Sequence, residues 1–272
     1  PALGMYRIIP RLLRDGARRL ALGASELDLA DRQQVKAFGR YWHGYAGELT
    51  HHHTVEDVIM FPELASRVPG GSVALTAIDG DHHHLDVVML HIGREIARVG
   101  RGRSTSRLIP LLDELSAHVD EHLDVEDAEL LPLFEDHFTG EEYAAIEARI
   151  HQEVPLGKQA LFTVPFIMAG TTAEEGAVLL ARAPQALRVV HRMTRKRHQR
   201  LCAIAFPRTS AVEAAAATGS SGAVPAPSTD GGPSESWWRD GEVRPSHVPP
   251  APHRGAGLDH RPGAGHRGGR PM

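Results

Sequence analysis

Pairs of histidine and carboxylate residues interrupt the apolar stripe of the segment 31–65, and this feature constrains the fold more than any other. The apolar residues there recur at helical spacing in two adjacent rows, Phe38, Tyr45 and Ile59 beside Trp42 and Leu49. His52 belongs to the first row and Glu56 to the second. A helix with this pattern turns both polar side chains toward the core.

Two further segments carry the same combination. Between 106 and 137, His122 continues a row of leucines and Glu126 lies on the adjacent row. Between 73 and 99, His82 shares a row with apolar residues and Asp86 follows four residues later. Because residues four apart lie one turn apart on the same helix face, each pair can present a ring nitrogen and a carboxylate oxygen to one point.

A bound cation explains these inward polar pairs. Burying an unpaired carboxylate costs several kcal/mol, and the sequence offers no matching set of inward lysines or arginines. Imidazole and carboxylate ligands without thiolate suit iron, manganese or zinc, and bridging carboxylates suit two ions. The alternative is that histidines in a chain with 18 of them are solvated, which we favour for His51, His83, His84 and His91. The predicted ligands are His52, Glu56, His82, Asp86, His122 and Glu126.

The sequence also contains an internal repeat. His52 and His122 are each followed by Glu-Asp at the fourth and fifth positions and by proline at the tenth, which are Pro62 and Pro132. Two helices that share this template predict a site with approximate two-fold character.

The pattern before residue 207 is helical throughout, so we expect an all-α protein. Helices are predicted over about 10–22, 31–65, 73–99 and 106–137, joined by short turns as in an up-down-up-down four-helix bundle. A capping box at Thr139 and Glu142 predicts another helix, and two more helical segments follow from about 172 and 184. The expected domains are a bundle over 1–138, a helical extension packed on it over 139–206, and a disordered Pro/Gly/Ala/His/Arg-rich tail over 207–272.

Charge and composition narrow the class of protein. A net charge of -4 gives no bias toward nucleic acid or an anionic membrane. The basic stretch 188–200 is interpreted as a solvated helix face, with nucleic acid, a membrane surface or an acidic partner as alternatives. One cysteine, no long apolar run and no signal-peptide pattern predict a soluble cytoplasmic protein without a membrane span.

The stretches "HHHTVEDVIMFP" (51–62), "DHHHLD" (81–86) and "EHLDVEDAELLP" (121–132) resemble the haemerythrin-like, HHE cation-binding domain. That family is a four-helix bundle with a non-haem di-iron centre. The resemblance covers about 5–137, and the extension to about 206 is similar to one in actinobacterial members. Ferritin-like carboxylate bundles differ, because their signature is Glu-x-x-His.

The resemblance implies roles for individual residues. His52 and His122 match ligands of the second and fourth helices, and Glu56 and Glu126 match the carboxylates that follow them. His82 matches the third-helix histidine, and Asp86 stands where haemerythrin has a second one. The first helix, "MYRIIPRLLRDG" (5–16), lacks the histidine that the family supplies there. His118 or His53 would substitute, one iron would keep an open position, or the site would be vestigial.

The implied cofactor is two non-haem iron ions, favoured over manganese or zinc. The implied function is binding or sensing of oxygen, nitric oxide, reactive oxygen species or iron itself, so that the partner is a small diatomic ligand or peroxide. The alternatives are an enzyme that disproportionates peroxide, and a degenerate metal site in a protein-binding or nucleic-acid-binding module that uses 188–200. We do not expect nucleic acid as a partner, and we assign no oligomeric state.

Overall fold

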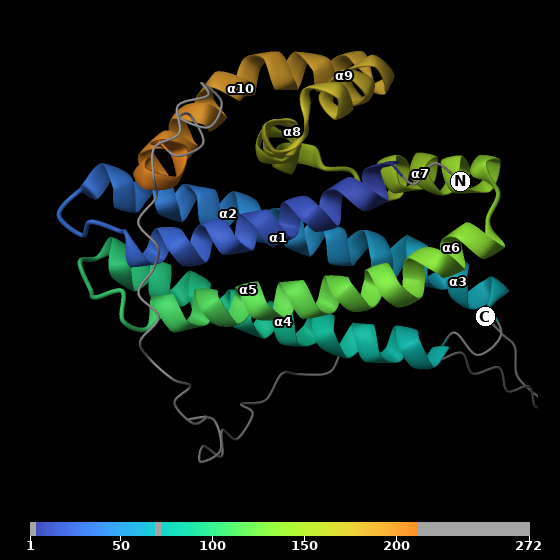
Figure 1. Ribbon diagram of the computed structural model, residues 1–272, viewed down its shortest axis with the longest axis horizontal. Coiled ribbons are helices and arrows are strands. Elements are labelled where there is room, and N and C mark those ends of the chain that lie inside the picture. The colour runs from blue at the N-terminus through green and yellow to red at the C-terminus, as the bar shows by residue number, and fades with distance from the viewer. Residues whose placement is uncertain (1–3, 69–71, 212–272) are drawn as a thin grey trace, which may run out of the picture. The chain divides into compact units, whose positions relative to one another are not determined.

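The computed structural model describes residues 4–68 and 72–211 (Figure 1). Every regular element in these ranges is a helix, which confirms the all-α prediction. None of the helices in these ranges combines the length and apolar character needed to cross a bilayer. Residues 207–211 are helical, and the rest of the predicted tail lies outside the described residues.

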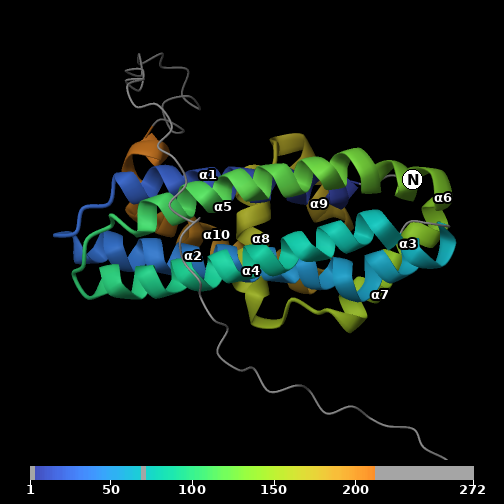
Figure 2. The ribbon, with the colours of Figure 1, turned by 90° about the horizontal axis from the view of Figure 1, so that it is seen from below.

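Four long helical segments form the body that carries the site (Figures 1 and 2). They are α1 (Gly4–Ser25); α2 (Arg32–Val55), continued by η1 (Glu56–Met60) and α3 (Phe61–Arg67); α4 (Ser72–Gly100); and α5 (Leu108–Val125), continued by η2 (Glu126–Leu130) and α6 (Leu131–His137). The main contacts join α1 to α2, α2 to α4, α4 to α5, and α5 to α1. In this ring, α2 and α5 lie on opposite corners.

The helix ends follow from local chemistry. Asp31 caps α2, where its carboxylate accepts hydrogen bonds from the backbone N–H groups of Gln33 and Gln34 at 2.8 and 3.0 Å. The turn after α4 uses Gly102 at a φ of 84°, a conformation that glycine adopts without strain. The first helix begins earlier than predicted, so Pro10 lies inside α1 and not in its first turn.

The two segments on opposite corners, which begin with α2 and α5 and which we call the diagonal segments, change from α-helix to π-helix at the predicted carboxylates Glu56 and Glu126. In η1 the Phe61 N–H donates to the Glu56 carbonyl five residues earlier, and in η2 the Leu131 N–H donates to the Glu126 carbonyl. A proline follows each donor and has no N–H of its own, and its ring would clash with the carbonyl four residues back in a regular α-helix. The wider π-turn accommodates it, so the repeated proline has a structural role.

The helices after residue 138 pack on one side of this body. Thr139 and Glu142 form the predicted capping box at α7 (Gly140–Glu153), and a second box at Thr172 begins α9 (Ala173–Arg182). The last long helix is α10 (Gln185–Ala205). It packs mainly against α2 and α8.

Helix α8 (Ala160–Gly170) was not predicted. Its sequence "ALFTVPFIMAG" is apolar all round and contains Pro165, so it shows no 3.6-residue polar pattern. It lies against α2, where Gly44 leaves room for the ring of Phe162. The broad apolar composition of α8 is therefore explained by its place between α2 and α10.

Candidate metal centre

The two repeated pairs meet across the bundle. One ligand atom each of His52, Glu56, His122 and Glu126 lies within 4.8 Å of the others, and all four residues are buried. His122 Nε2 is 2.7 Å from Glu126 Oε1. His52 Nε2 is 3.5 Å from Glu56 Oε1 and 3.6 Å from Glu126 Oε2, so this ring lies between the carboxylates of the two diagonal helices.

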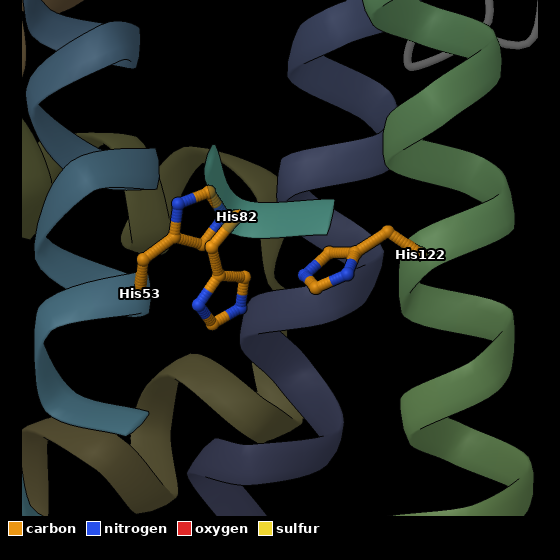
Figure 3. Close-up of side chains that lie close together, drawn as sticks. All are labelled: His53, His82 and His122. Atoms are coloured by element: carbon orange, nitrogen blue, oxygen red, sulfur yellow. The ribbon is translucent and has the colours of Figure 1, made fainter. Parts of the chain in front are cut away.

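A second group adjoins the first and shares His122 with it. The rings of His53 and His82 are stacked with centroids 4.1 Å apart, and the His122 ring is edge-on to His82 at 4.9 Å (Figure 3). One ring nitrogen of each of these three residues also lies within 4.8 Å of the others. His82 Nε2 is 3.5 Å from Glu56 Oε2, which connects the two groups. Together these residues form one buried set, which we call the histidine–glutamate centre: His52, His53, Glu56, His82, His122 and Glu126.

Asp57 fixes the orientation of His82. Its carboxylate lies 2.9 Å from His82 Nδ1, so the ring N–H at that position donates to Asp57. Nε2 then carries a lone pair and faces the centre, which is how carboxylates commonly orient metal-binding histidines. The equivalent residue of the second repeat, Asp127, contacts Arg14 of α1 at 3.0 Å instead. Asp57 of the first repeat thus contacts His82 from α4, whereas Asp127 of the second repeat contacts the guanidinium group of Arg14 from α1.

The prediction that Asp86 faces the core is wrong. Its side chain is 58% exposed, and Oδ1 comes no closer than 4.0 Å to His53 Nδ1. Four residues advance a helix by slightly more than one turn, and on α4 the buried stripe continues from His82 to Leu85, three residues on. Leu85 of α4 and His53 of α2 are thus buried on the side where Asp86 was expected.

Of the two substitutes considered for the missing first-helix histidine, the structure brings His53 into the centre and leaves His118 outside it. His53 lies four residues after the buried Leu49 and shares the wide inward face of α2. The prediction treated only two adjacent rows of this helix as buried. A helix packed between several neighbours buries a wider face. That spacing from Leu49 is the signal that identifies His53.

The centre contains more polar atoms than its own contacts can satisfy. Ten of its buried ring nitrogens and carboxylate oxygens make no hydrogen bond, on His52, His53, Glu56, His82, His122 and Glu126. No lysine or arginine is among the buried side chains wherever the structure describes burial. Unsatisfied buried polar groups are costly, and a metal ion would satisfy nitrogen and oxygen donors together. The residues present therefore fit a bound cation.

Electrostatics favour the neutral imidazoles of His53 and His82, the form that metal binding requires. Burial and then the neighbouring rings of His82, His52 and His122 lower the pKa of His53 to about 2. Burial, and then His122, also lowers the pKa of His82. Burial and the adjacent Glu126 carboxylate raise the pKa of Glu56 well above its ordinary value. Burial opposes ionisation of Glu126 as well, but its contacts with His122 and His52 outweigh that effect and lower its pKa.

Comparison with known families agrees with this geometry. A family model described as the hemerythrin HHE cation binding domain matches residues 10–134, a range that contains every member of the histidine–glutamate centre. Searches among curated proteins and among solved structures found no match. Residues 10–134 of this chain thus form a domain of the hemerythrin HHE cation-binding family.

Proposed function

We propose that the histidine–glutamate centre binds two non-haem iron ions, and that the protein uses them to bind or sense oxygen, nitric oxide or reactive oxygen species. The observation that carries the proposal is the set of ten buried nitrogen and oxygen atoms in the centre that make no hydrogen bond. We further propose that the four long segments form an up-down-up-down bundle around it. The main contacts between α1, α2, α4 and α5 support that arrangement.

The positions of the carboxylates support two ions over one. Glu56 has one oxygen 3.5 Å from His52 and the other 3.5 Å from His82. Glu126 likewise has one oxygen near His122 and the other near His52. A carboxylate whose two oxygens face different imidazoles would be available as a ligand to two cations. His53 and His82 would hold one ion, His52 the other, and His122 borders both positions.

The rest of the chain controls what reaches the ions. When bound, iron supplies a redox-active centre with exchangeable coordination positions. Phe61 stacks beside His82 with ring centroids 5.7 Å apart, and Leu49 and Ile59, on the same helical segment as His52 and Glu56, are fully buried. These side chains exclude bulk water and hold the rings in place. Burial and the neighbouring Glu126 raise the pKa of Glu56, and cation binding would favour loss of its proton, so metal uptake should depend on pH.

We also propose that the helices after residue 138 pack on the bundle and that the protein resides in a reducing compartment. Phe166, Cys202 and Phe206 belong to the same apolar core as residues of α1 and α2, which supports a helical extension over 139–206 packed on the bundle of 1–138. A reducing compartment such as the cytoplasm fits the presence of a single cysteine, Cys202, which is buried.

The test is the iron content of protein purified from iron-supplemented cells, together with its absorption spectrum before and after reduction. We expect two iron ions per chain and a near-ultraviolet charge-transfer band that changes on reduction. His122→Ala should remove the metal with the helical content unchanged. His91→Ala is the matched control, because His91 is an exposed histidine on α4. This variant should retain both ions. One ion or none in the wild-type protein would contradict the di-iron proposal.

A further inference from the structure

A row of potential ligands on α5 and the start of η2 leads from the surface to the histidine–glutamate centre. Glu114, His118, His122 and Glu126 follow one another at four-residue spacing. Because four residues turn a helix by about 400°, each member is rotated by about 40° from the one before. The side chain of Glu114 is 35% exposed, that of His122 is 2% exposed, and that of Glu126 is fully buried.

The outer end of this row meets a histidine from α4. The rings of His84 and His118 approach edge-on with centroids 4.4 Å apart, and His84 Nε2 lies 3.9 Å from Glu114 Oε1. One ligand atom of each residue lies within 4.8 Å of the others. His118 Nδ1 is shielded from solvent and has no hydrogen-bond partner. We call these three residues the outer triad. The sequence favoured a solvated His84; its side chain is 50% exposed and has these two neighbours.

A pocket connects the outer triad to the buried centre. It has a volume of about 280 Å³ between α4 and α5, which run side by side in Figure 2. Its lining residues are Asp81, His84, Leu85, His118, Glu121 and His122. His122 is a member of the histidine–glutamate centre, so the same pocket touches both groups. Asp81 and Glu121 are exposed and add negative charge at the mouth, which raises the local concentration of cations.

We propose that the outer triad is a second metal site, which takes up a divalent transition-metal cation from solvent and passes it through the pocket to His122. Two imidazoles and one carboxylate are ligands that suit Fe²⁺ or Zn²⁺ and leave further coordination positions for water. Such a site is open enough to exchange its ion, whereas the centre is enclosed. The delivery role rests on the proposed function of the centre, and the outer site itself does not.

The first experiment counts metal sites by titrating the full chain with Zn²⁺ against a chromophoric chelator. We compare wild type, the double variant His84→Ala/His118→Ala, and the control His83→Ala/His91→Ala, which removes two exposed histidines of the same region. The triad variant should bind one Zn²⁺ fewer, or bind it at least about 10–100-fold more weakly, since even loss of a residue that supports a ligand costs that much. The control should match wild type. Equal Zn²⁺ binding by all three proteins would overturn the proposal.

The second experiment measures how fast Fe²⁺ enters the centre under anaerobic conditions, as the fraction that resists a rapid pulse of a strong ferrous chelator. The triad variant should load several-fold more slowly than wild type and reach the same final iron content. Loss of the Zn²⁺ equivalent with an unchanged loading rate would overturn the delivery role. If wild type takes up no iron while the triad still binds Zn²⁺, the proposed function fails and the outer site stands.

Discussion

Replacing Asp57 tests whether His82 is held in place for metal binding. Its carboxylate, 41% exposed, accepts from His82 Nδ1 at 2.9 Å and thereby directs Nε2 toward Glu56 and the centre. Asp57→Asn retains an acceptor but removes the charge. A hydrogen bond to a charged group contributes about 1.5–3 kcal/mol and a neutral one about 0.5–1.5 kcal/mol, so the expected loss is about 1–1.5 kcal/mol. That corresponds to a roughly tenfold weaker affinity for one metal ion. Asp57→Ala removes the bond altogether and should weaken binding by up to about a hundredfold.

The internal repeat supplies the control for this experiment. Asp127 occupies the same position in the second repeat and has the same exposed fraction, 41%, but its partner is Arg14. Arg14 also contacts Asp124 at 2.8 Å, so Asp127→Asn leaves the guanidinium paired. Metal affinity is measured by competition with a chromophoric chelator, and folding by circular dichroism. The reasoning is refuted if Asp57→Asn binds metal as tightly as wild type, or if Asp127→Asn weakens binding to the same extent.

Three further outcomes are expected. Burial, and then the charge of Arg19, lowers the pKa of His198 from 6.5 to about 4. The neutral ring therefore stabilises the fold above pH 6.5, and up to about 3 kcal/mol of this stability is lost as the pH falls through 4. In urea titrations, His198→Phe should lose less stability between pH 7 and pH 4.5 than wild type. Gly44→Ala places a Cβ against the Phe162 ring and should destabilise the fold by about 1–3 kcal/mol. The Cβ of Gly80→Ala meets no neighbour, so this variant should stabilise the fold by about 0.5–1 kcal/mol. Thermal unfolding measures both effects. Metal at 100 times its dissociation constant should raise the unfolding free energy by about 2.7 kcal/mol, and an unchanged melting temperature would show that no metal binds the native state.

Much of the fold follows from helical periodicity and capping residues. The stripes that run into His52 and His122 predicted the diagonal helices because they are buried on one side and solvated on the other. Helix α8 was not predicted, because it has neighbours on several sides and carries no polar face. Helical periodicity is recognised from the contrast between a polar and an apolar face. The π-turns at Glu56 and Glu126 were also not predicted, although the repeated prolines that accompany them were visible. Their effect depends on the carbonyl four residues earlier, which a residue pattern does not display.

Among the ligands, spacing predicts which face a side chain lies on but not how far that face extends. His52, His82 and His122 lie on rows continuous with apolar core residues, and each is buried. Asp86 is rotated by about 40° from His82, and its side chain is 58% exposed, so on α4 the four-residue spacing does not bring the carboxylate into the core. His53 and the outer triad depend on which helices become neighbours. That information is in the contacts between α2, α4 and α5.

The two halves of the centre are unequal, and this predicts unequal affinities for the two ions that we propose it binds. Position 53 is histidine, but its equivalent in the second repeat is the buried Leu123. Helix α4 supplies His82 beside Asp57, whereas α1 supplies Arg14 beside Asp127. Both additional imidazoles thus border the same side of the centre. We expect metal titration to show two separate steps, with the tighter one on the side of His53 and His82.

The variant His53→Leu reproduces the second repeat's own residue in the first repeat. Leucine is close in size to the imidazole it replaces, and it already occupies the equivalent position 123 in the core. The fold should therefore survive, and its apolar core should lose little. The tighter step should disappear from the titration while the weaker step remains, because His52, Glu56 and Glu126 are unchanged. If both steps vanish together, the ions bind as one cooperative unit, and the assignment of a separate ion to each side is wrong.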